Sequence, residues 1–353
     1  MKLNKLGAIA LFIGLLFTSC STDDDATMPV PKGDYENGLL ISHEGNFGQG
    51  NASISYVSYD FNTVEHTIFN TINGQLLGDI AQSMAFNGDF AYIILNVSNK
   101  IEVVNRYTFE SVATIDTGLS NPRYMAIANG KGYVTNWGDG SNATDDYVAV
   151  VNLSTNTLSG TSILVEEGPE KIIASGNSIY VAHEGGFGQN NKITVINGTT
   201  DELANIITIG DVPNSLQLDN SGNLWVLCGG KPSWTGDETG GQLFKIDTSD
   251  NSATSIDFGA TEHPSFLNFD GGNLYYYLSG SVFKTDLTLS SLPNTPEISG
   301  VAFYGMRVKD AILYGLDAKD FQSNGELIVY DLSTNTETNK ITLGIIPGAV
   351  YFN

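Results

Sequence analysis

The sequence has few positive charges. It contains 16 Lys and Arg residues against 39 Asp and Glu residues, which gives a formal net charge of −23. DNA and RNA binding depends on Lys and Arg contacts to phosphates, so this composition excludes nucleic acid as a partner. Binding to an anionic membrane surface is disfavoured for the same reason. Acidity of this kind mostly favours solubility, and it leaves room for a cationic ligand.

Cysteine and helical periodicity are also scarce. The two cysteines are Cys20 and Cys228, so no disulfide framework is expected. We expect Cys228 to be buried and unreactive. No segment shows sustained apolar periodicity of 3.6 residues; short runs rich in Tyr, Val, Ile, Thr and Phe alternate with Gly, Asn, Asp and Ser. This pattern predicts an all-β fold.

The apolar run near the N-terminus, Leu6 to Phe17, is shorter than the roughly 20 residues that span a bilayer. It follows Lys2 and Lys5 and is typical of a secretory signal. Small residues then precede Cys20, which resembles a bacterial lipobox, although Phe17 stands where Leu is usual. We predict that residues 1–20 are a lipoprotein signal peptide and that Cys20 is lipidated. Contact with the membrane would then occur through the lipid anchor only.

Residues 21–37 are predicted to form an acidic and Pro-rich tether. Its acidic run, Asp23 to Asp25, resembles the surface-export signal of Bacteroidetes lipoproteins, and a plain solvated linker is the alternative. The export interpretation places the chain at the outer membrane, lipid-anchored and exposed on the cell surface.

Repeated units indicate the architecture. Pro122–Gly168, Pro169–Val212 and Pro213–Gly259 each contain four short strand patterns, with a period of about 40 to 47 residues. Three further units have the same pattern: Ala81–Asn121, His263–Gly300 and Val301–Ile346. Gly38–Gly78 supplies three strands and Pro347–Phe352 supplies one. We therefore predict that residues 38–353 form a seven-bladed β-propeller of four-stranded antiparallel blades, with six or eight blades as alternatives. The C-terminal strand would close the ring by pairing with the first blade.

Gly132–Asn136 reads GYVTN, which resembles the signature of YVTN-type propellers. In such a fold, the loops that join strand two to strand three of each blade emerge on one face. These loops are long here and rich in aromatic, amide and acidic residues. Two of them, His43–Asn51 (HEGNFGQGN) and His183–Asn191 (HEGGFGQNN), are nearly identical.

Rigid aromatic surface beside amide groups suits a large amphiphilic ligand. The alternative is that the aromatic residues only hold the long loops against neighbouring blades, and that the repeated HEGxFGQ merely reflects copied blades. The candidate ligand-binding residues are His43, Glu44, Phe47, Gln49, Asn51, Asn96, Arg123, Tyr124, Asn136, Trp137, His183, Glu184, Phe187, Gln189, Lys231, Trp234, Tyr304, Asp317 and Phe321.

Motifs for catalysis are missing, since there is no GxSxG, HExxH or CxxC. We therefore predict a binding protein with no catalytic residue and no required metal or cofactor. A lactonase-like metal enzyme is an alternative within the propeller fold. The segment Asp139–Asp146 (DGSNATDD) offers several oxygen ligands, so we also consider a structural Ca²⁺ ion there.

The surface lipoprotein signal, the seven YVTN-like blades and the opening segment HEGNFGQGNASIS together resemble the BtuG family of Bacteroidetes, within the YncE/YVTN-type propellers. This resemblance covers residues 38–353. It implies capture of vitamin B12 or a related corrinoid and transfer to the TonB-dependent outer-membrane transporter BtuB. A protein- or glycan-binding surface propeller of another uptake system is the alternative function.

Overall fold

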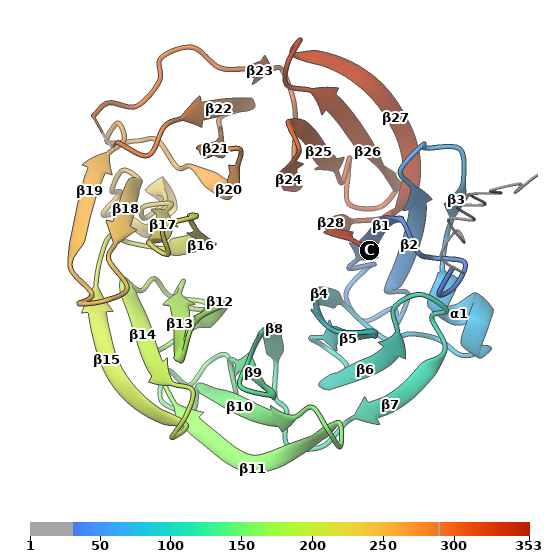
Figure 1. Cartoon of the computed structure of the whole chain (residues 1–353). Helices are drawn as coiled ribbons and strands as arrows, with labels where there is room; N and C mark the ends of the chain where they lie inside the picture. Colours follow the sequence, from blue (N-terminus) through green and yellow to red (C-terminus); the bar gives the residue numbers. More distant parts are fainter. Residues whose placement is uncertain (1–30, 289) are drawn as a thin grey trace, which may run out of the picture. The chain divides into compact units, whose positions relative to one another are not determined.

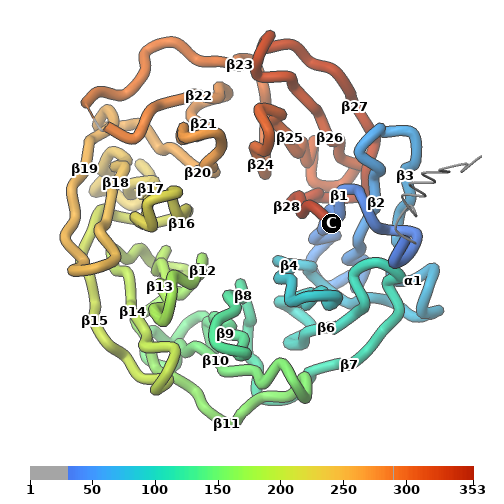
Figure 2. The backbone as a smooth tube through the Cα atoms, in the orientation of Figure 1, coloured from blue at the N-terminus to red at the C-terminus, as the bar shows by residue number. Residues whose placement is uncertain are grey.

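The computed structural model describes residues 31–288 and 290–353. The predicted signal peptide, Cys20 and most of the tether therefore lie outside the described residues. Lys32–Asn353 form one compact unit. It consists of seven four-stranded antiparallel sheets arranged around a central channel, as Figures 1 and 2 show. The predicted seven-bladed propeller is confirmed.

The blades are numbered from the N-terminus, and each is given from the channel outward. Blade 1 contains β28 (Pro347–Phe352), β1 (Gly38–His43), β2 (Ser53–Ser58) and β3 (Val64–Glu65). Blade 2 contains β4 (Ala81–Asn87), β5 (Phe90–Leu95), β6 (Lys100–Asn105) and β7 (Ser111–Ile115). Blade 3 contains β8 (Pro122–Ala128), β9 (Lys131–Asn136), β10 (Tyr147–Asn152) and β11 (Thr157–Leu164).

The remaining blades have the same order. Blade 4 contains β12 (Pro169–Ser175), β13 (Ser178–His183), β14 (Lys192–Asn197) and β15 (Glu202–Thr208). Blade 5 contains β16 (Pro213–Leu218), β17 (Leu224–Cys228), β18 (Gln242–Ile246) and β19 (Ala253–Asp257). Blade 6 contains β20 (Ser265–Asp270), β21 (Asn273–Leu278), β22 (Ser281–Thr285) and β23 (Ile298–Ser299). Blade 7 contains β24 (Gly305–Lys309), β25 (Ile312–Asp317), β26 (Asn324–Asp331) and β27 (Thr336–Ile345).

The two ends of the propeller meet in blade 1. β28 pairs antiparallel with β1, with Leu39 opposite Phe352, and the main-chain N–H of Asn353 donates to the carbonyl of Gly38 at 2.8 Å. The side chain of Asn353 also donates to the carbonyl of Tyr35 and accepts from Arg106. This pairing is the predicted closure, and it removes the open sheet edge that an unclosed ring would have.

The apolar core lies between blades. The described residues contain seven clusters of buried side chains, one at each boundary between neighbouring blades. Successive residues of a strand point to opposite faces, so Tyr133 of β9 packs toward blade 4 while Val134 packs toward blade 2. Both faces of each middle strand are buried, which explains why these strands read as continuous apolar runs. Cys228 lies in one of these clusters as a buried free thiol.

In each of blades 2, 3 and 4, a tyrosine on the second strand contacts the blade that follows. Tyr133, the aromatic residue of GYVTN, donates from its hydroxyl toward the Gly198 carbonyl at 2.9 Å or the Asp201 carboxylate at 2.6 Å. Tyr92 and Tyr180 make equivalent contacts to Asn156 and to the turn at Thr248. The tyrosine that recurs in these three repeats therefore makes a contact between blades. An isolated blade would leave its hydroxyl without this partner.

Blade 1 departs from the regular pattern. Its outer strand β3 has only two residues, and it is followed by a short helix, α1 (Ile68–Asn73), whose Ile68 and Phe69 are buried. Helical periodicity over so short a segment is too weak to predict from sequence. None of the helices in the described residues is long and apolar enough to cross a membrane.

Candidate functional site

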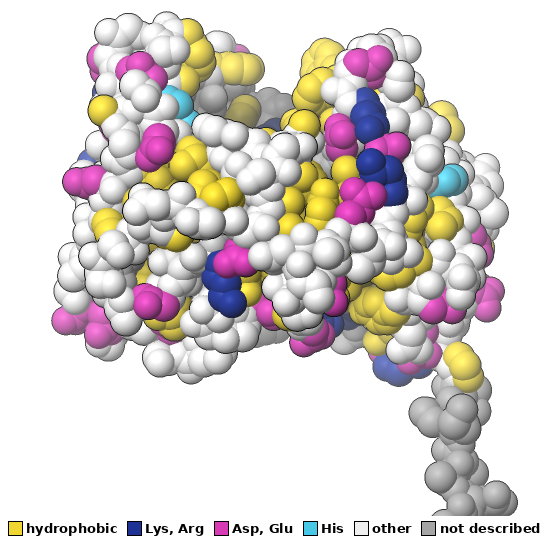
Figure 3. All heavy atoms as spheres, turned by 90° about the horizontal axis from the view of Figure 1, so that it is seen from above, with side chains coloured by type: hydrophobic (Ala, Val, Ile, Leu, Met, Phe, Trp, Pro, Cys, Tyr) yellow, Lys and Arg dark blue, Asp and Glu magenta, His cyan; other side chains and the backbone are white. Residues whose placement is uncertain are grey.

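Five long loops emerge on one face of the propeller, because each joins the second strand of its blade to the third. They connect β1 to β2, β9 to β10, β13 to β14, β17 to β18 and β25 to β26, and we call this side the long-loop face. The equivalent connections in blades 2 and 6 are short. Viewed from the side, the propeller has two raised parts with a hollow between them, and hydrophobic surface borders the hollow (Figure 3).

Four aromatic side chains project from this face into solvent. Phe47 and Phe187 are each 78% exposed, Trp234 is 73% exposed and Phe321 is 46% exposed. The fifth predicted aromatic residue, Trp137, is only partly exposed, because its indole N–H donates to the carbonyl of Pro169 at 3.1 Å. Large apolar side chains in soluble proteins are usually buried, so these four exposed rings distinguish the long-loop face from the rest of the surface.

The two HEGxFGQ loops begin in the same way, with a left-handed glycine after the glutamate. Gly45 and Gly185 have positive φ angles of 72° and 101°, and a Cβ atom at either would lie within 3.0 Å of the main chain on the returning side of its loop. Glycine is therefore required at both positions. Each loop then presents its phenylalanine at the tip and turns its glutamate, Glu44 or Glu184, toward charged groups at the channel mouth.

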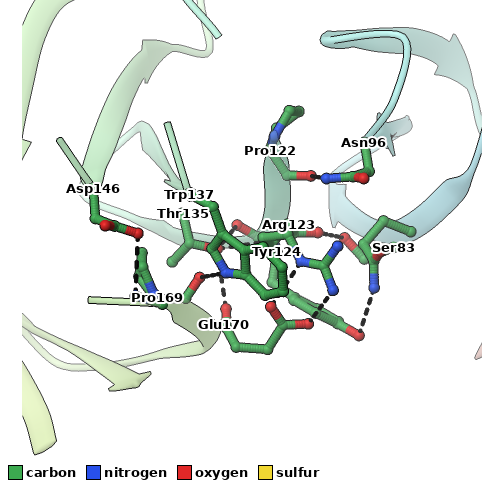
Figure 4. A network of polar contacts seen from close by, with 12 residues as sticks. Ser83, Asn96, Pro122, Arg123, Tyr124, Thr135, Trp137, Asp146, Pro169 and Glu170 are labelled. Atoms are coloured by element: carbon green, nitrogen blue, oxygen red, sulfur yellow. Dashed lines mark hydrogen bonds and ion pairs between the residues drawn. The ribbon is translucent and has the colours of Figure 1, made fainter. Parts of the chain in front are cut away.

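These charged groups form what we call the mouth cluster, which contains Glu44, Arg123, Tyr124, Glu170, Lys171, Glu184 and Tyr304. Arg123 of β8 makes two charge-assisted hydrogen bonds to Glu170 of β12, at 2.7 and 2.8 Å, as Figure 4 shows. Its guanidinium also lies 4.1 Å from the ring centroid of Trp137. The bidentate pair joins blades 3 and 4 at the channel mouth, where Glu170 is almost fully buried.

The other members of the mouth cluster are held by weaker contacts than this bidentate ion pair. The Lys171 ammonium lies 3.6 Å from the ring centroid of Tyr124, a cation–π contact. Tyr304 donates its hydroxyl to the carboxylate of Glu44, at 3.0 and 3.1 Å from its two oxygens, and packs edge-to-face on Phe321. Burial raises the pKa of Glu44, although the bond from Tyr304 opposes the shift.

Glu184 has different neighbours from Glu44, the equivalent residue of the blade 1 loop. Burial, reinforced by the neighbouring carboxylate of Glu170, raises the pKa of Glu184 to about 8. Lys171 and Arg123 oppose the shift without cancelling it.

The structure corrects the expectation that both histidines reach a ligand. His43 and His183 are fully buried between blades, where the Nε2 atoms lie 2.8 Å from the hydroxyls of Ser55 and Thr194. Burial lowers the pKa of His43 to about 3 and that of His183 to about 4, so both are neutral. The strand alternation that turns each glutamate toward the channel mouth turns the preceding histidine into the core.

Two asparagines are corrected in the same way. Asn136 is fully buried, accepts from the Ser120 N–H at 3.1 Å and donates to the Val134 carbonyl. Asn96 is also buried and donates to the Pro122 carbonyl at 3.2 Å. Both amides complete the main-chain hydrogen bonds of the loops, so neither is free to bind a ligand.

The remaining predicted residues lie on or beside the long-loop face. Gln49 is exposed and Gln189 is partly exposed. Asn51 accepts from the Asn46 N–H at 2.8 Å and so also holds its loop. Lys231 pairs with Asp237 within its loop at 2.6 Å, and Asp317 pairs with Lys319 at 3.2 Å. The sequence also predicts Glu170 and Lys171 at the channel mouth, because they begin the first strand of a blade, and they lie there, although they are not among the candidate ligand-binding residues.

The acidic segment Asp139–Asp146 is organised by its own hydrogen bonds. Asp139 accepts from Ser141, and Asp145 accepts from the N–H of Asp139 at 3.0 Å. Asp146 accepts from the Gly168 N–H, and burial raises its pKa to about 6. No group of three or more His, Cys, Asp or Glu residues suited to a metal ion was found between residues 31 and 353, with residue 289 left aside. The Ca²⁺ ion remains a prediction.

Comparison with known proteins identifies a family and a fold. Residues 37–347 match the family described as a domain of unknown function, DUF5074. No curated protein matches the sequence significantly.

Several solved structures share the architecture. A quinoprotein alcohol dehydrogenase-like protein from Bacteroides thetaiotaomicron is 13% identical, with a TM-score of 0.68 over 90% of this chain and 78% of that one. A candidate 6-phosphogluconolactonase from Bacteroides uniformis is 15% identical, with a TM-score of 0.64 over 90% and 100% of the two chains. A hypothetical selenium-binding protein from Sulfolobus tokodaii is 10% identical, with a TM-score of 0.64 over 91% and 94%. At these identities the similarity concerns the fold alone.

Proposed function

We propose that this chain, which belongs to the DUF5074 family, is a binding protein that captures a corrinoid on its long-loop face. The observation that carries the proposal is the grouping of Phe47, Phe187, Trp234 and Phe321, exposed by 46 to 78%, on one face of the propeller. A corrinoid is a large, flat ring with apolar edges and a fringe of amides. Exposed aromatic rings can cover the edges, while polar side chains between them bind the amides.

The charge of the chain supports a ligand with a cationic centre. The whole chain carries a net charge of −23. Acidic surfaces attract cationic ligands over a distance comparable with the Debye length. The rigid blades beneath the loops would limit the entropy lost on binding, which favours high affinity.

The proposal extends to the cell surface. In it the protein is a BtuG-like lipoprotein, anchored at the outer membrane through Cys20, that hands the corrinoid to a TonB-dependent transporter without catalysing a reaction. Metabolic labelling of the expressed chain with a palmitate analogue tests the anchor, with Cys20→Ser as the control. Label that persists in the Cys20→Ser variant would contradict lipidation at that residue.

Isothermal titration of the purified protein with cyanocobalamin tests the binding function. We expect a single saturable site, accompanied by a change in the visible spectrum of the ligand. A double variant, Phe47→Ala with Phe187→Ala, should weaken binding by at least about tenfold, since it removes the two most exposed rings. The matched control is Leu164→Ala, which removes a 66% exposed apolar side chain from the outer strand β11. No heat and no spectral change at micromolar ligand would overturn the proposal.

Binding of a glycan or a protein is the alternative, because exposed aromatic rings also stack on sugars and anchor protein interfaces. Capture experiments on the intact outer membrane distinguish the two. Co-purification with a carbohydrate transporter, together with loss of capture in the Trp234→Ala variant, would favour the alternative over the corrinoid.

A further inference from the structure

The strands that line the channel have the opposite charge balance from the chain as a whole. These are the innermost strands of the seven blades: β28, β4, β8, β12, β16, β20 and β24. Together they contain four basic and two acidic residues, namely Arg123, Lys171, Arg307 and Lys309 against Glu170 and Asp270. In the whole chain, by contrast, 39 acidic residues outnumber 16 basic ones. The topology therefore places an excess of positive charge along the channel of an acidic protein.

Both acids of these strands already have partners in the fold. Glu170 forms the bidentate pair with Arg123. The carboxylate of Asp270 accepts from the main-chain N–H groups of Asp310 and Ala311, at 2.9 and 3.0 Å. Among residues 31–288 and 290–353, no carboxyl group forms an ion pair with either basic residue of β24. The positive charge of β24 is therefore not balanced locally.

Arg307 of β24 occupies a position that contacts the next blade elsewhere in the ring. It has the same register to its second strand as Gln217 of β16 and Asn268 of β20. The amide of Gln217 donates to the carbonyl of Leu267 at 2.9 Å, and that of Asn268 donates to the carbonyl of Met306 at 3.2 Å. Each of these bonds reaches the innermost strand of the following blade. The guanidinium of Arg307 donates no hydrogen bond to the described residues, so blade 1 does not use it in this way.

Solvent reaches Arg307 although it belongs to the innermost strand. Its side chain is exposed, whereas those of its neighbours Met306 and Val308 are buried, because successive residues of a strand point to opposite sides. The surrounding protein still lowers the pKa of Arg307 by burial, and the one charge that opposes the shift comes from Tyr351. Arginine stays charged in proteins in spite of such a shift. Arg307 is thus a charged group with unused N–H donors that faces an open part of the channel.

The chemistry of this group favours an oxyanion. The planar guanidinium presents parallel N–H donors that match two oxygens of a carboxylate or a phosphate. Lys309 lies on the same side of β24, about 7 Å further along the strand, and supplies a second positive charge. Salt screens charges that lie more than about 8 to 10 Å away, so acids on the outer surface repel an anion within the channel only weakly.

We propose that the central channel binds a small oxyanion, a phosphate or a carboxylate, through the guanidinium of Arg307. Lys309 strengthens the binding by its charge. The site lies on the wall of the channel and not on the loops that carry the exposed aromatic rings. The inference therefore goes beyond the proposed corrinoid function and does not depend on it.

Isothermal titration with inorganic phosphate at low ionic strength tests the site, with sodium acetate titrated in parallel. We expect saturable binding of phosphate by the wild type. Arg307→Gln should weaken it by at least about tenfold, because it removes a charge-assisted pair of hydrogen bonds. Arg307→Lys should weaken it less, since the charge remains and only the fork of donors is lost. Saturable binding of acetate as well would identify a site for carboxylates, and binding of phosphate alone would identify a site for phosphorylated ligands.

The matched control is Lys340→Gln, which removes the same charge from an exposed position on β27, the outermost strand of blade 7. It should bind phosphate like the wild type. The proposal is overturned if the wild type gives no saturable heat with either anion, or if Arg307→Gln binds no more weakly than Lys340→Gln. Circular dichroism shows whether each variant is folded. Should Arg307→Gln fail to fold, unchanged affinity in both Arg307→Lys and Lys309→Gln would overturn the site instead.

Discussion

His43 and His183 end β1 and β13 at equivalent positions, and each is followed by a glutamate at the channel mouth. The histidines have neutral imidazoles bonded to a serine or a threonine within the core. An adjacent pair that looks like an acid–base dyad in the sequence is therefore split between two environments. The glutamates lie at the channel mouth, and the histidines contribute to stability.

The buried histidines make the protein sensitive to acid. Because burial lowers the pKa of His183 to about 4, the unfolded chain binds more protons than the folded one below the ordinary histidine pKa of 6.5. The stabilisation is fully present above pH 6.5 and is lost as the pH falls toward 4. We expect each buried histidine to reduce the free energy of unfolding by roughly 2 kcal/mol between pH 7 and pH 5.

Urea unfolding at several pH values measures this effect. The variant His183→Gln should show a shallower loss of stability in acid than the wild type. Thr194→Val removes the hydrogen bond to the ring but leaves the ring buried, so it should lower stability at all pH values and keep the wild-type slope. Equal slopes for His183→Gln and the wild type would contradict the prediction.

At the scale of elements, the repeat is defined by contacts between blades. Tyr92, Tyr133 and Tyr180 occupy one position of the second strand in blades 2 to 4 and hold the turn of the following blade. Tyr314 occupies the same position in blade 7, where its hydroxyl makes no such contact to the described residues. The tyrosine of the GYVTN signature thus marks a hydrogen-bonding contact between one blade and the next.

This comparison predicts unequal costs for the same substitution. Tyr133→Phe removes the donor to Gly198 and Asp201, so it should lower the free energy of unfolding by about 1 to 3 kcal/mol. Tyr314→Phe removes a hydroxyl that has no hydrogen-bond partner among residues 31–288 and 290–353, and it should cost less than about 0.5 kcal/mol. Denaturant unfolding of both variants provides the comparison, and equal costs would show that the contact to blade 4 contributes nothing.

At the scale of the whole molecule, ring closure connects the two ends of the propeller. β28 comes from the C-terminus, and the other three strands of blade 1 come from the N-terminal part. Without β28, blade 1 would lose its channel-lining strand, and β1 would present an unpaired edge. The boundaries of blade 1 with blades 2 and 7 are both built on this sheet.

Removal of Pro347–Asn353 should therefore abolish cooperative unfolding. The lost strand pairing and the two weakened boundaries are comparable with the total stability of a domain, which is about 5–15 kcal/mol. The matched control is Asn353→Ala, which removes side-chain bonds to Tyr35 and Arg106 and keeps β28. Differential scanning calorimetry should show one sharp transition for the control and none for the truncated chain. A sharp transition in both would mean that the ring does not need closure.

The sequence by itself determined the strands, their grouping into seven units and the closure of the ring. These features depend on local alternation, turn residues and a repeat of fixed length, all of which are visible along the chain. It also placed the long loops and their aromatic residues on one face, since the direction of antiparallel strands settles which connections share a side.

Only the tertiary structure decided which polar residues of the candidate site are free. The pairing of Arg123 with Glu170 joins two blades through positions far apart in sequence, and no local pattern records it. Asn96 and Asn136 resemble exposed amides in the sequence but complete hydrogen bonds of neighbouring loops. The different states of Glu44 and Glu184 arise because blade 7 supplies a tyrosine where blade 3 supplies an arginine that is already paired. Satisfaction of a polar group depends on its neighbours in space, and identical loops can meet different neighbours.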